Sequence, residues 1–524
     1  MTDFKLTYAT MFNPPAELHT RFDAALAKVK AGLGREYPMI INNKDVFAGE
    51  KYERRSPVNT DWVLAVMQKG NEQHAHQALA AARQAFPGWS HTPWQDRVRL
   101  LRKVADLIDQ RMFEMGSAMA LEVGKNRMEC LGDIAETSDH IRYACSQMED
   151  NNGFIVEMDK DPLVGYDATN LSVLRPYGVW MVVSPFNFPF ALTGAPAGSA
   201  LVSGNTIVIK PATDTAWTVR LLAECFRDAG LPEGVCNFVT GPGRTLGQAL
   251  VDSPEVDGVT FTGSFDVGMK MFQDYARGKY VRPIILELGG KNPAIVSRHA
   301  DLERATAGIV RSAFGLQGQK CSAASRIYIE APVYDELIGM LKVATEKLAI
   351  GDPTEQANFL GPVINQNSYN DFKNFTEEIN QGGGKFLTGG KVKSGGLFDK
   401  GYFCEPTLVT DLPMDHRLWK HEMFLPISTI AKVKNLDEAM LYGNDVNYGL
   451  TAGFYGSQKE ADVFFDKIQA GVTYANRPQG ATTGAWPGFQ PFGGWKGSGS
   501  SGKNAGGHYY LPLYMHEQIR TLIK

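Results

Sequence analysis

Apolar residues recur at intervals of three and four positions between residues 93 and 116, and this spacing predicts an amphipathic helix. Helical patterns dominate the chain up to about residue 150. Two extended stretches follow, at residues 153–158 and 170–175, on either side of a polar, turn-rich segment. They predict a β-hairpin outside the main alternation of strands and helices. The helical stripe consists of Trp94, Val98, Leu101, Ala105, Ile108 and Met112.

Between residues 178 and 287, short β-branched runs alternate with helical patterns, which predicts parallel strands joined by helical crossovers. The helix between the second and third runs is expected to begin near Thr215 and to end at Gly230. We therefore expect a five-stranded, Rossmann-like sheet. Its strands are predicted at GVWMVVS from Gly178, TIVIK from Thr206, VCNFV from Val235, VDGVTF from Val256 and RPIILE from Arg282.

After Gly290 the alternation resumes with PAIVS, RIYIE and several helical patterns, which predicts a second α/β domain extending to about Asn476. The tail after Gly493 is rich in glycine, serine and aromatic residues. Its last stretch, YYLPLYMHEQIR, has the character of an arm that packs on another surface, and we interpret it as an element of oligomerisation.

Composition narrows the classes of function. A chain of 524 residues suggests two or three domains of roughly 100 to 200 residues, with clefts between them. The formal charge of -4 includes no basic excess, so no nucleic-acid partner is expected. No apolar run approaches the roughly 18 residues of a membrane span, and no signal segment is recognised, which predicts a cytoplasmic protein without a membrane partner. The six cysteines include no C-x-x-C pair and are expected to be free, mostly buried thiols.

Three polar stretches lie next to predicted strands, the region where open parallel sheets place their ligands. They are SPFNFP from Ser184, ELGGKNP from Glu287 and GQKCSAASR from Gly318. Together with four further motifs, their order and spacing resemble the aldehyde dehydrogenase superfamily over nearly the whole chain. The further motifs are KPAT at Lys210, FTGS at Phe261, E-x-F from Glu422 and PFGGWKGSG from Pro491.

The resemblance implies an α/β fold of three parts. A Rossmann-like NAD(P)-binding domain is expected at residues 1–150 and 176–288, and an α/β catalytic domain at 289–490. A small β oligomerisation arm is expected at 151–175 and 491–524, in a homodimer or higher homo-oligomer.

The reaction that the resemblance implies is oxidation of an aldehyde to an acid through a cysteine thiohemiacetal and thioester. It needs a nucleophile, an oxyanion donor and a base, and Cys321, Asn187 and Glu287 match these roles. Cys321 lies between Lys320 and Ser322 in a polar, glycine-flanked segment that suits an exposed thiolate, although free cysteines are more often buried core thiols. Glu287 ends an apolar strand, where burial can raise its pKa; its alternatives are an ion pair or a helix cap. Asn187 could instead shape a turn beside two prolines.

The cofactor site has no G-x-G-x-x-G after the first strand, and the glycine run from Gly241 is by itself an ordinary loop. The resemblance instead implies that Lys210 contacts the adenosine ribose, Ser264 a phosphate at a helix N-terminus, and Glu422 the nicotinamide ribose. Thr213 stands where many NAD-preferring relatives carry glutamate, so NADP is permitted beside NAD. The other cofactor residues that the resemblance implies are Ser184, Pro185, Phe186, Gly243, Phe261, Thr262, Gly263, Leu288, Gly289 and Phe424.

Within the superfamily, TTGAWPGFQPFGG from Thr482 and GKNAGGHYYL from Gly502 resemble the glutamate gamma-semialdehyde (1-pyrroline-5-carboxylate) dehydrogenases. The implied reaction converts L-glutamate gamma-semialdehyde to L-glutamate in proline catabolism. The α-carboxylate of the semialdehyde is expected to bind Ser322 and the backbone of Gly484 and Ala485, with Lys320 adding a positive charge. The rings of Phe188 and Phe489 are expected to flank its aliphatic chain.

Two departures from that branch affect the substrate. Trp486 and Pro487 stand where relatives more often carry smaller aliphatic residues, which can reshape the pocket, and GGHYY replaces the commoner G-G-P-D-Y. Oxidation of another semialdehyde or an aliphatic aldehyde therefore stays open. A CoA-acylating enzyme is disfavoured because Glu287 can activate water. A catalytically silent scaffold is disfavoured by the complete set of reactive residues. A metal hydrolase is disfavoured because the ten histidines include no H-E-x-x-H, so no metal is expected.

Overall fold

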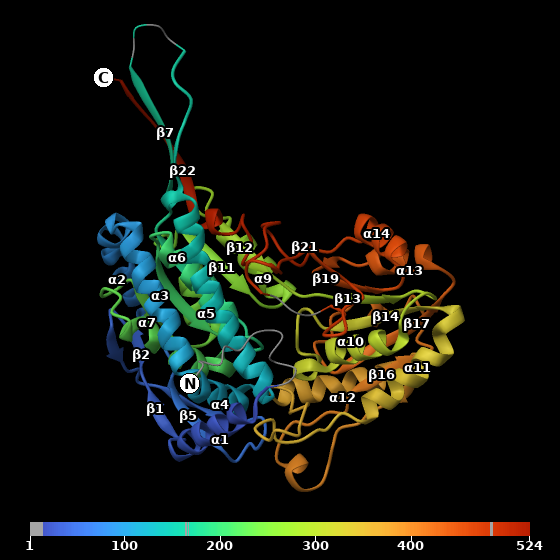
Figure 1. Ribbon diagram of the computed structural model, residues 1–524. Coiled ribbons are helices and arrows are strands. Elements are labelled where there is room, and N and C mark those ends of the chain that lie inside the picture. The colour runs from blue at the N-terminus through green and yellow to red at the C-terminus, as the bar shows by residue number, and fades with distance from the viewer. Residues whose placement is uncertain (1–13, 163–164, 166, 483–485, 524) are drawn as a thin grey trace.

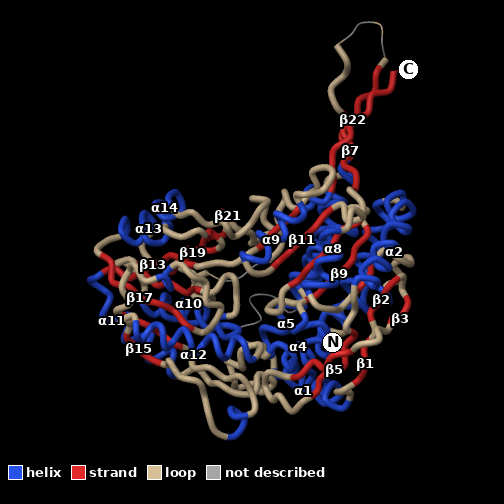
Figure 2. The backbone as a smooth tube through the Cα atoms, turned by 180° about the vertical axis from the view of Figure 1, so that it is seen from behind, coloured by secondary structure: helices blue, strands red, loops and turns tan. Residues whose placement is uncertain are grey.

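The computed structural model describes residues 14–162, 165, 167–482 and 486–523. Two seven-stranded sheets lie side by side among helices, and a narrow group of strands projects from the body (Figure 1). The opposite view in Figure 2 shows the same two lobes and the same projecting strands. The α/β class predicted from the sequence is confirmed.

The first sheet has the strand order β12-β11-β8-β9-β10-β2-β3. All five predicted strands are present and parallel. The predicted size is wrong, because β2 (Met39–Ile41) and β3 (Lys44–Val46) add two antiparallel strands beyond β10. Each has only three residues, too few to show a strand periodicity in the sequence. The five predicted strands are β8 (Val179–Ser184), β9 (Thr206–Pro211), β10 (Cys236–Phe238), β11 (Gly258–Thr262) and β12 (Ile284–Glu287).

Helices cover both faces of this sheet. Alternate residues of a strand point to opposite faces, and β8 divides its side chains in this way. Trp180 and Val182 join the hydrophobic cluster under α3 to α7, whereas Val179 and Met181 join the cluster under α2, α8 and α9. The helices are α2 (Glu72–His91), α3 (Trp94–Gln110), α4 (Met112–Val123), α5 (Arg127–Asp150), α6 (Ala191–Val202), α7 (Ala216–Asp228), α8 (Gln248–Asp252) and α9 (Phe265–Tyr275).

Two features of the early chain differ from the prediction. The helix expected at residues 93–116 is broken between α3 and α4, because Arg111 has φ -98° and ψ 6°. The apolar stripe continues across the break and hides it in the sequence. The early chain is also less helical than expected, since a small sheet follows α1. These elements are α1 (Ala16–Ala31), β1 (Arg35–Tyr37), β4 (Lys51–Arg55) and β5 (Val63–Gln68).

The second sheet has the order β15-β16-β17-β14-β13-β19-β20, and the predicted strands PAIVS and RIYIE form its parallel neighbours β13 and β14. Only β15 runs antiparallel to its neighbour. The strands are β13 (Asn292–Val296), β14 (Ala324–Glu330), β15 (Lys385–Thr388), β16 (Thr407–Thr410), β17 (Ile427–Val433), β19 (Thr451–Tyr455) and β20 (Val472–Ala475). The helices are α10 (Leu302–Phe314), α11 (Ala331–Glu346), α12 (Gln366–Gln381), α13 (Leu436–Asn444) and α14 (Gln458–Lys467).

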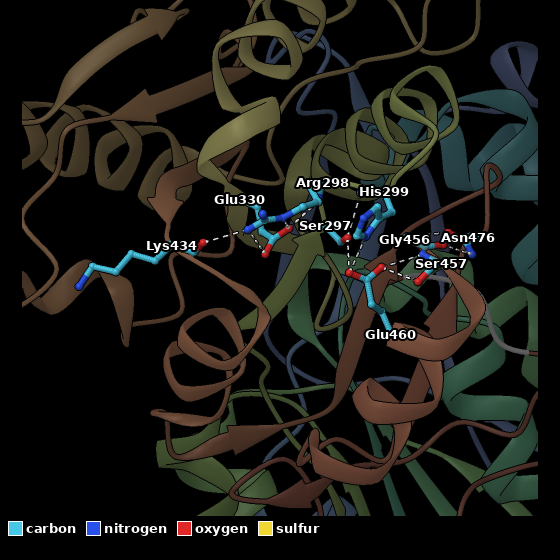
Figure 3. A network of polar contacts seen from close by, with 9 residues as sticks. All are labelled: Ser297, Arg298, His299, Glu330, Lys434, Gly456, Ser457, Glu460 and Asn476. Carbon is cyan, nitrogen blue, oxygen red and sulfur yellow. Dashed lines mark hydrogen bonds and ion pairs between the residues drawn. The ribbon is translucent and has the colours of Figure 1, made fainter.

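A polar network ties together the carboxyl-terminal edge of the second sheet (Figure 3). Glu460 accepts hydrogen bonds from Ser297 Oγ (2.8 Å) and from Ser457 Oγ (2.7 Å), which caps α14. Arg298 Nε donates to Glu330 Oε2 at 2.9 Å. The opposite edge of the sheet meets the first sheet, because β12 ends shortly before β13 begins.

The projecting arm contains β6 (Ile155–Glu157), β7 (Ala168–Pro176) and β22 (Met515–Ile523), all antiparallel. Its first two strands are the predicted hairpin. Residues 491–514, which were also expected in the arm, instead cross the body. There β21 (Trp495–Lys496) pairs with β18 (Tyr448–Gly449), and Ser498 Oγ donates to Gly289 O at 2.7 Å. None of the helices in the described ranges is both long enough and apolar enough to cross a membrane.

Candidate active site

A cavity of about 330 Å³ lies at the junction of the two sheets. Its wall includes Glu287 at the end of β12, Cys321 in the loop before β14, and Phe188 in the loop after β8. Carboxyl ends of parallel strands are the usual ligand positions in open α/β sheets. The three motif stretches found in the sequence therefore converge on one cavity.

Cys321 is half-buried in this wall, whereas the other five cysteines are buried. Its carbonyl accepts a hydrogen bond from Asn292 Nδ2 at 2.7 Å. A Cβ atom at Gly290 would lie 2.2 Å from that carbonyl oxygen, so only glycine fits beside it. Burial, together with the Glu422 and Glu287 carboxyl groups, raises the pKa of Cys321 to about 12. The exposed thiolate expected from the sequence is therefore a half-buried thiol, because the fold surrounds it with apolar and acidic groups.

Glu287 is 8% exposed, and burial raises the pKa of its carboxyl group well above the ordinary value. Its Oε2 has no hydrogen-bond partner among the described residues. Thr262 lies opposite Glu287 in the pairing of β11 with β12, and both line the cavity. A raised pKa makes the carboxylate of such a group a stronger base for proton transfer.

Asn187 is buried in the turn after β8. Its Oδ1 accepts a hydrogen bond from the Phe188 N–H at 3.1 Å, and its NH₂ group is the donor side of the amide. Among the described residues, the lining of the cavity includes Phe188 but not Asn187. The oxyanion role of the Asn187 amide stays a prediction.

One end of the cavity carries charged groups beside Cys321. Lys320 Nζ lies 2.5 Å from Glu129 Oε1 on α5, and both side chains are largely buried. Burial by itself would raise the pKa of Glu129, but the Lys320 charge holds it below the ordinary value. The centroid of the Phe188 ring lies 3.5 Å from Lys125 Nζ and 5.6 Å from Lys320 Nζ. Ser322 lines the same cavity, so a hydroxyl group and the Glu129-paired ammonium group of Lys320 both belong to the wall that contains Cys321.

The tail segment contributes aromatic side chains. Trp486, Phe492 and Tyr510 line the cavity, whereas Phe489 is 67% exposed and is not among the described lining residues. Trp486 and Gln490 exchange two backbone hydrogen bonds of 2.9 Å, and the turn between them directs Phe489 to solvent. The predicted contact of Phe489 with the substrate is therefore not supported. Gly484 and Ala485 lie outside the described residues.

A second group of predicted residues gathers near Lys210. This lysine is buried, its Nζ donates to Pro211 O at 3.1 Å, and burial lowers its pKa to about 8. The turn Gly243–Gly247 passes beside it, since a Cβ at Gly247 would lie 3.2 Å from Lys210 Cε. Thr213 is exposed at the start of the next helical turn. Ser184 Oγ is buried and has no hydrogen-bond partner among the described residues, so it is available to a ligand.

The FTGS motif leads from β11 into α9. Phe261 and Thr262 are the last residues of the strand, Gly263 follows, and Ser264 is the N-cap of α9. The Ser264 side chain makes no capping hydrogen bond and is exposed. The first N–H groups of a helix have no intrahelical partner, which suits an anion here.

Glu422 contacts the segment that joins the two sheets. Its Oε1 accepts a hydrogen bond from the Gly290 N–H at 2.7 Å, and burial raises its pKa to about 7. A Cβ at Gly289 would lie 2.2 Å from Glu422 Oε2, so the approach requires glycine. The ring of Phe424 meets the ring of Phe186 edge to face at 5.7 Å. The E-x-F, ELGGK and SPFNFP motifs thus contact one another.

Residues 46–519 match the sequence profile described as the aldehyde dehydrogenase family. The chain belongs to this family. A 1-pyrroline-5-carboxylate dehydrogenase of Geobacillus thermodenitrificans (strain NG80-2) is 38% identical over 507 residues, which cover 96% of this chain and 95% of that protein.

Solved structures resemble this aldehyde dehydrogenase over its whole length. The structure of 1-pyrroline-5-carboxylate dehydrogenase from Thermus with bound NAD gives a TM-score of 0.92 at 33% identity, and covers 99% of this chain and 98% of that one. Proline utilization A from Bdellovibrio bacteriovorus, inactivated by N-propargylglycine, gives 0.91 at 32% identity. The match covers 96% of this chain and 51% of that protein, so this chain spans about half its length.

Sequence reasoning missed part of the cavity of this aldehyde dehydrogenase. Glu129, Asp133, Glu136 and His140 line it from one face of α5. Their helical spacing was a signal that could have marked this face. Tyr510 gave no such signal, because the fold brings it from the distant tail. No group of three or more His, Cys, Asp or Glu side chains in the described ranges is placed to hold a metal ion.

Proposed function

We propose that this aldehyde dehydrogenase oxidises L-glutamate gamma-semialdehyde to L-glutamate, with NAD as the hydride acceptor. Relatives named 1-pyrroline-5-carboxylate dehydrogenase support this substrate, and an NAD-bound structure of that name supports the cofactor. The observation that carries the proposal is the placement of Lys320 and Ser322 on either side of Cys321 in one cavity wall. A carboxylated aldehyde can present its carbonyl group to the thiol and its carboxylate to these two side chains.

In the proposed mechanism, Cys321 gives its thiol proton to solvent water, and its sulfur adds to the aldehyde carbon, forming a thiohemiacetal. The Asn187 amide and the Cys321 backbone N–H donate hydrogen bonds to the oxyanion, each contributing on the order of 3 kcal/mol. Bound NAD would supply the hydride acceptor for the former aldehyde carbon, and loss of that hydride would leave a thioester on Cys321.

Hydrolysis of the thioester is assigned to Glu287. Its carboxylate takes a proton from water, the oxygen attacks the thioester carbon, and Cys321 leaves as the acid is released. Because the side chain is buried without an ion pair among the described residues, its raised pKa makes it an effective base.

The cofactor is assigned to the side chains around Lys210, Ser264 and Glu422. The buried, unpartnered Ser184 Oγ supports this assignment, because a buried hydroxyl group normally has a hydrogen-bond partner. The contact of Glu422 with Gly289 and Gly290 supports it as well, since it brings the E-x-F and ELGGK motifs together.

The test compares kcat/KM for pyrroline-5-carboxylate, succinic semialdehyde and unbranched alkanals. Turnover is measured from the absorbance of the reduced cofactor. We expect pyrroline-5-carboxylate to be preferred, with NAD and NADP assayed in parallel. A preference for succinic semialdehyde or an alkanal would contradict the substrate. Added CoA should leave the rate unchanged.

The arm is proposed to pair with another copy of the chain. Its exposed apolar side chains support this, because isolated strands seldom expose such a surface to water. They are Ile155, Val156, Met158, Ile519, Leu522 and Ile523. Light scattering after size-exclusion chromatography should show a homodimer or larger oligomer. Deletion of residues 515–524 should give a species with fewer subunits. The cytoplasmic location stays a prediction that cell fractionation tests.

A further inference from the structure

One wall of the active-site cavity is an indole ring held in a fixed position. Trp486 is 9% exposed and lines the same cavity as Cys321. Its Nε1 donates a hydrogen bond to Asp139 Oδ2 on α5 at 2.9 Å. Hydrogen bonds to a carboxylate are stronger than those between neutral groups, so this contact fixes the side-chain rotamer.

The backbone around Trp486 is anchored as well. Trp486 and Gln490 exchange two hydrogen bonds, and the Gly488 N–H donates to Gly506 O at 2.8 Å. Arg477 Nη1 donates to Gln490 Oε1 at 2.5 Å. Gly488 has φ +87°, a conformation that favours glycine. Displacement of the Trp486 backbone would therefore break several hydrogen bonds, and rotation of the ring would break the one to Asp139.

The cavity has both polar and apolar lining residues. Lys320 and Ser322 flank Cys321, whereas Leu192, Pro196 and Phe492 give the cavity apolar lining of the same kind as Trp486. The indole N–H is directed to Asp139, so the ring offers the cavity an aromatic surface. A large, rigid apolar group of this kind excludes part of the volume that a longer aldehyde would occupy.

We propose that Trp486 limits substrate length, so that this enzyme oxidises short semialdehydes in preference to long-chain aldehydes. The identity of the short substrate rests on the proposed function. The length limit itself does not, because it follows from the size and anchoring of one side chain. Trp486 acts by exclusion and takes no part in the chemical steps.

The test compares Trp486→Leu and Trp486→Ala with the unmodified enzyme on unbranched alkanals from propanal to decanal. We expect kcat/KM for the longest alkanals, relative to propanal, to rise about tenfold or more in Trp486→Ala and less in Trp486→Leu. This rise in kcat/KM should come from a lower KM more than from a higher kcat. Asp139→Asn, which keeps the size of the anchor but removes its charge, should give a smaller gain of the same kind.

Trp495→Ala is the matched control. Trp495 is 50% exposed in β21 and is not among the described lining residues, so its removal should leave the length profile unchanged. Circular dichroism reports whether each variant folds, and Trp486→Leu decides the result if Trp486→Ala does not fold.

An unmodified enzyme that oxidises decanal as readily as propanal would overturn the proposal, as would an unchanged profile in folded Trp486→Leu. If pyrroline-5-carboxylate proves a poor substrate, the proposed function fails. In that case, the ratio of kcat/KM for long alkanals to kcat/KM for short alkanals still tests the role of Trp486.

Discussion

Glu287 and Cys321 belong to different sheets and still line one cavity. Glu287 is the last residue of β12 in the first sheet, and Cys321 precedes β14 in the second. Gly290 connects them, because its N–H donates to Glu422 and its Cα lies against the Cys321 carbonyl. Glycine at position 290 therefore allows the segment after Glu287 to lie against the backbone of Cys321.

Replacement of Cys321, the proposed nucleophile, should abolish turnover without unfolding the protein. In Cys321→Ala no thiohemiacetal can form, so dehydrogenase activity should fall by at least about a thousandfold. Thermal unfolding should change little, because the thiol is half-buried and unpaired with other cysteines. Cys236→Ala, which removes a buried thiol, is the control and should stay active. Normal activity in Cys321→Ala would refute the mechanism.

Replacement of Glu287, the proposed base, should separate oxidation from hydrolysis. Glu287→Gln keeps the shape of the side chain but cannot accept a proton from water. We expect a rapid burst of about one reduced cofactor per active site, followed by turnover slowed roughly 10²- to 10⁴-fold. Mass spectrometry should find the acyl group on Cys321. A variant that turns over at the normal rate with no burst would exclude Glu287 as the hydrolytic base.

The buried Glu287 carboxyl group should also make stability depend on pH. Because its pKa is raised above 4.5, the folded protein binds this proton more tightly than the unfolded chain does. The stabilisation is fully present below about pH 4.5 and is lost as pH rises through the raised pKa, by at most about 1.4 kcal/mol per pH unit. Urea unfolding should show the unmodified protein losing stability relative to Glu287→Gln as pH increases. A stability difference between the two proteins that stays constant with pH would contradict a buried Glu287 carboxyl group with a raised pKa.

The ion pair between Lys320 and Glu129 should support both stability and substrate binding. Lys320→Met leaves a buried carboxylate without its partner, which should cost about 3 to 5 kcal/mol of unfolding free energy. It should also raise KM for pyrroline-5-carboxylate more than for propanal. Lys432→Met, which breaks an exposed pair with Asp335, should change stability by less than about 1 kcal/mol. Equal losses of unfolding free energy in the two variants would contradict the larger contribution expected of the buried ion pair.

The residue at position 213 should control discrimination between the two dinucleotides. Thr213 is exposed near Lys210, and the Thr213→Glu variant places a carboxylate that repels a 2′-phosphate. We expect the ratio of kcat/KM for NADP to that for NAD to fall about tenfold, with little change for NAD. Thr213→Ser serves as the neutral control. An unchanged ratio would place the adenosine ribose elsewhere.

The sequence alone determined the five parallel strands of the first sheet and the identity of the reactive motifs. Strands β8 to β12 are strong local patterns, since β-branched runs bounded by turns and helices need no distant information to be recognised. The motifs containing Glu287, Cys321 and Glu422 are likewise short and could be found in order along the chain.

Only the tertiary structure decided which side chains share the cavity and how their acidity is changed. The acidic face of α5, Tyr510 and the inward Trp486 come from distant segments, and packing between those segments places them together. Phe489 turns outward because of hydrogen bonds between residues 486 and 490. The raised pKa of Cys321 has the same origin, because burial depends on what the rest of the chain places around a group.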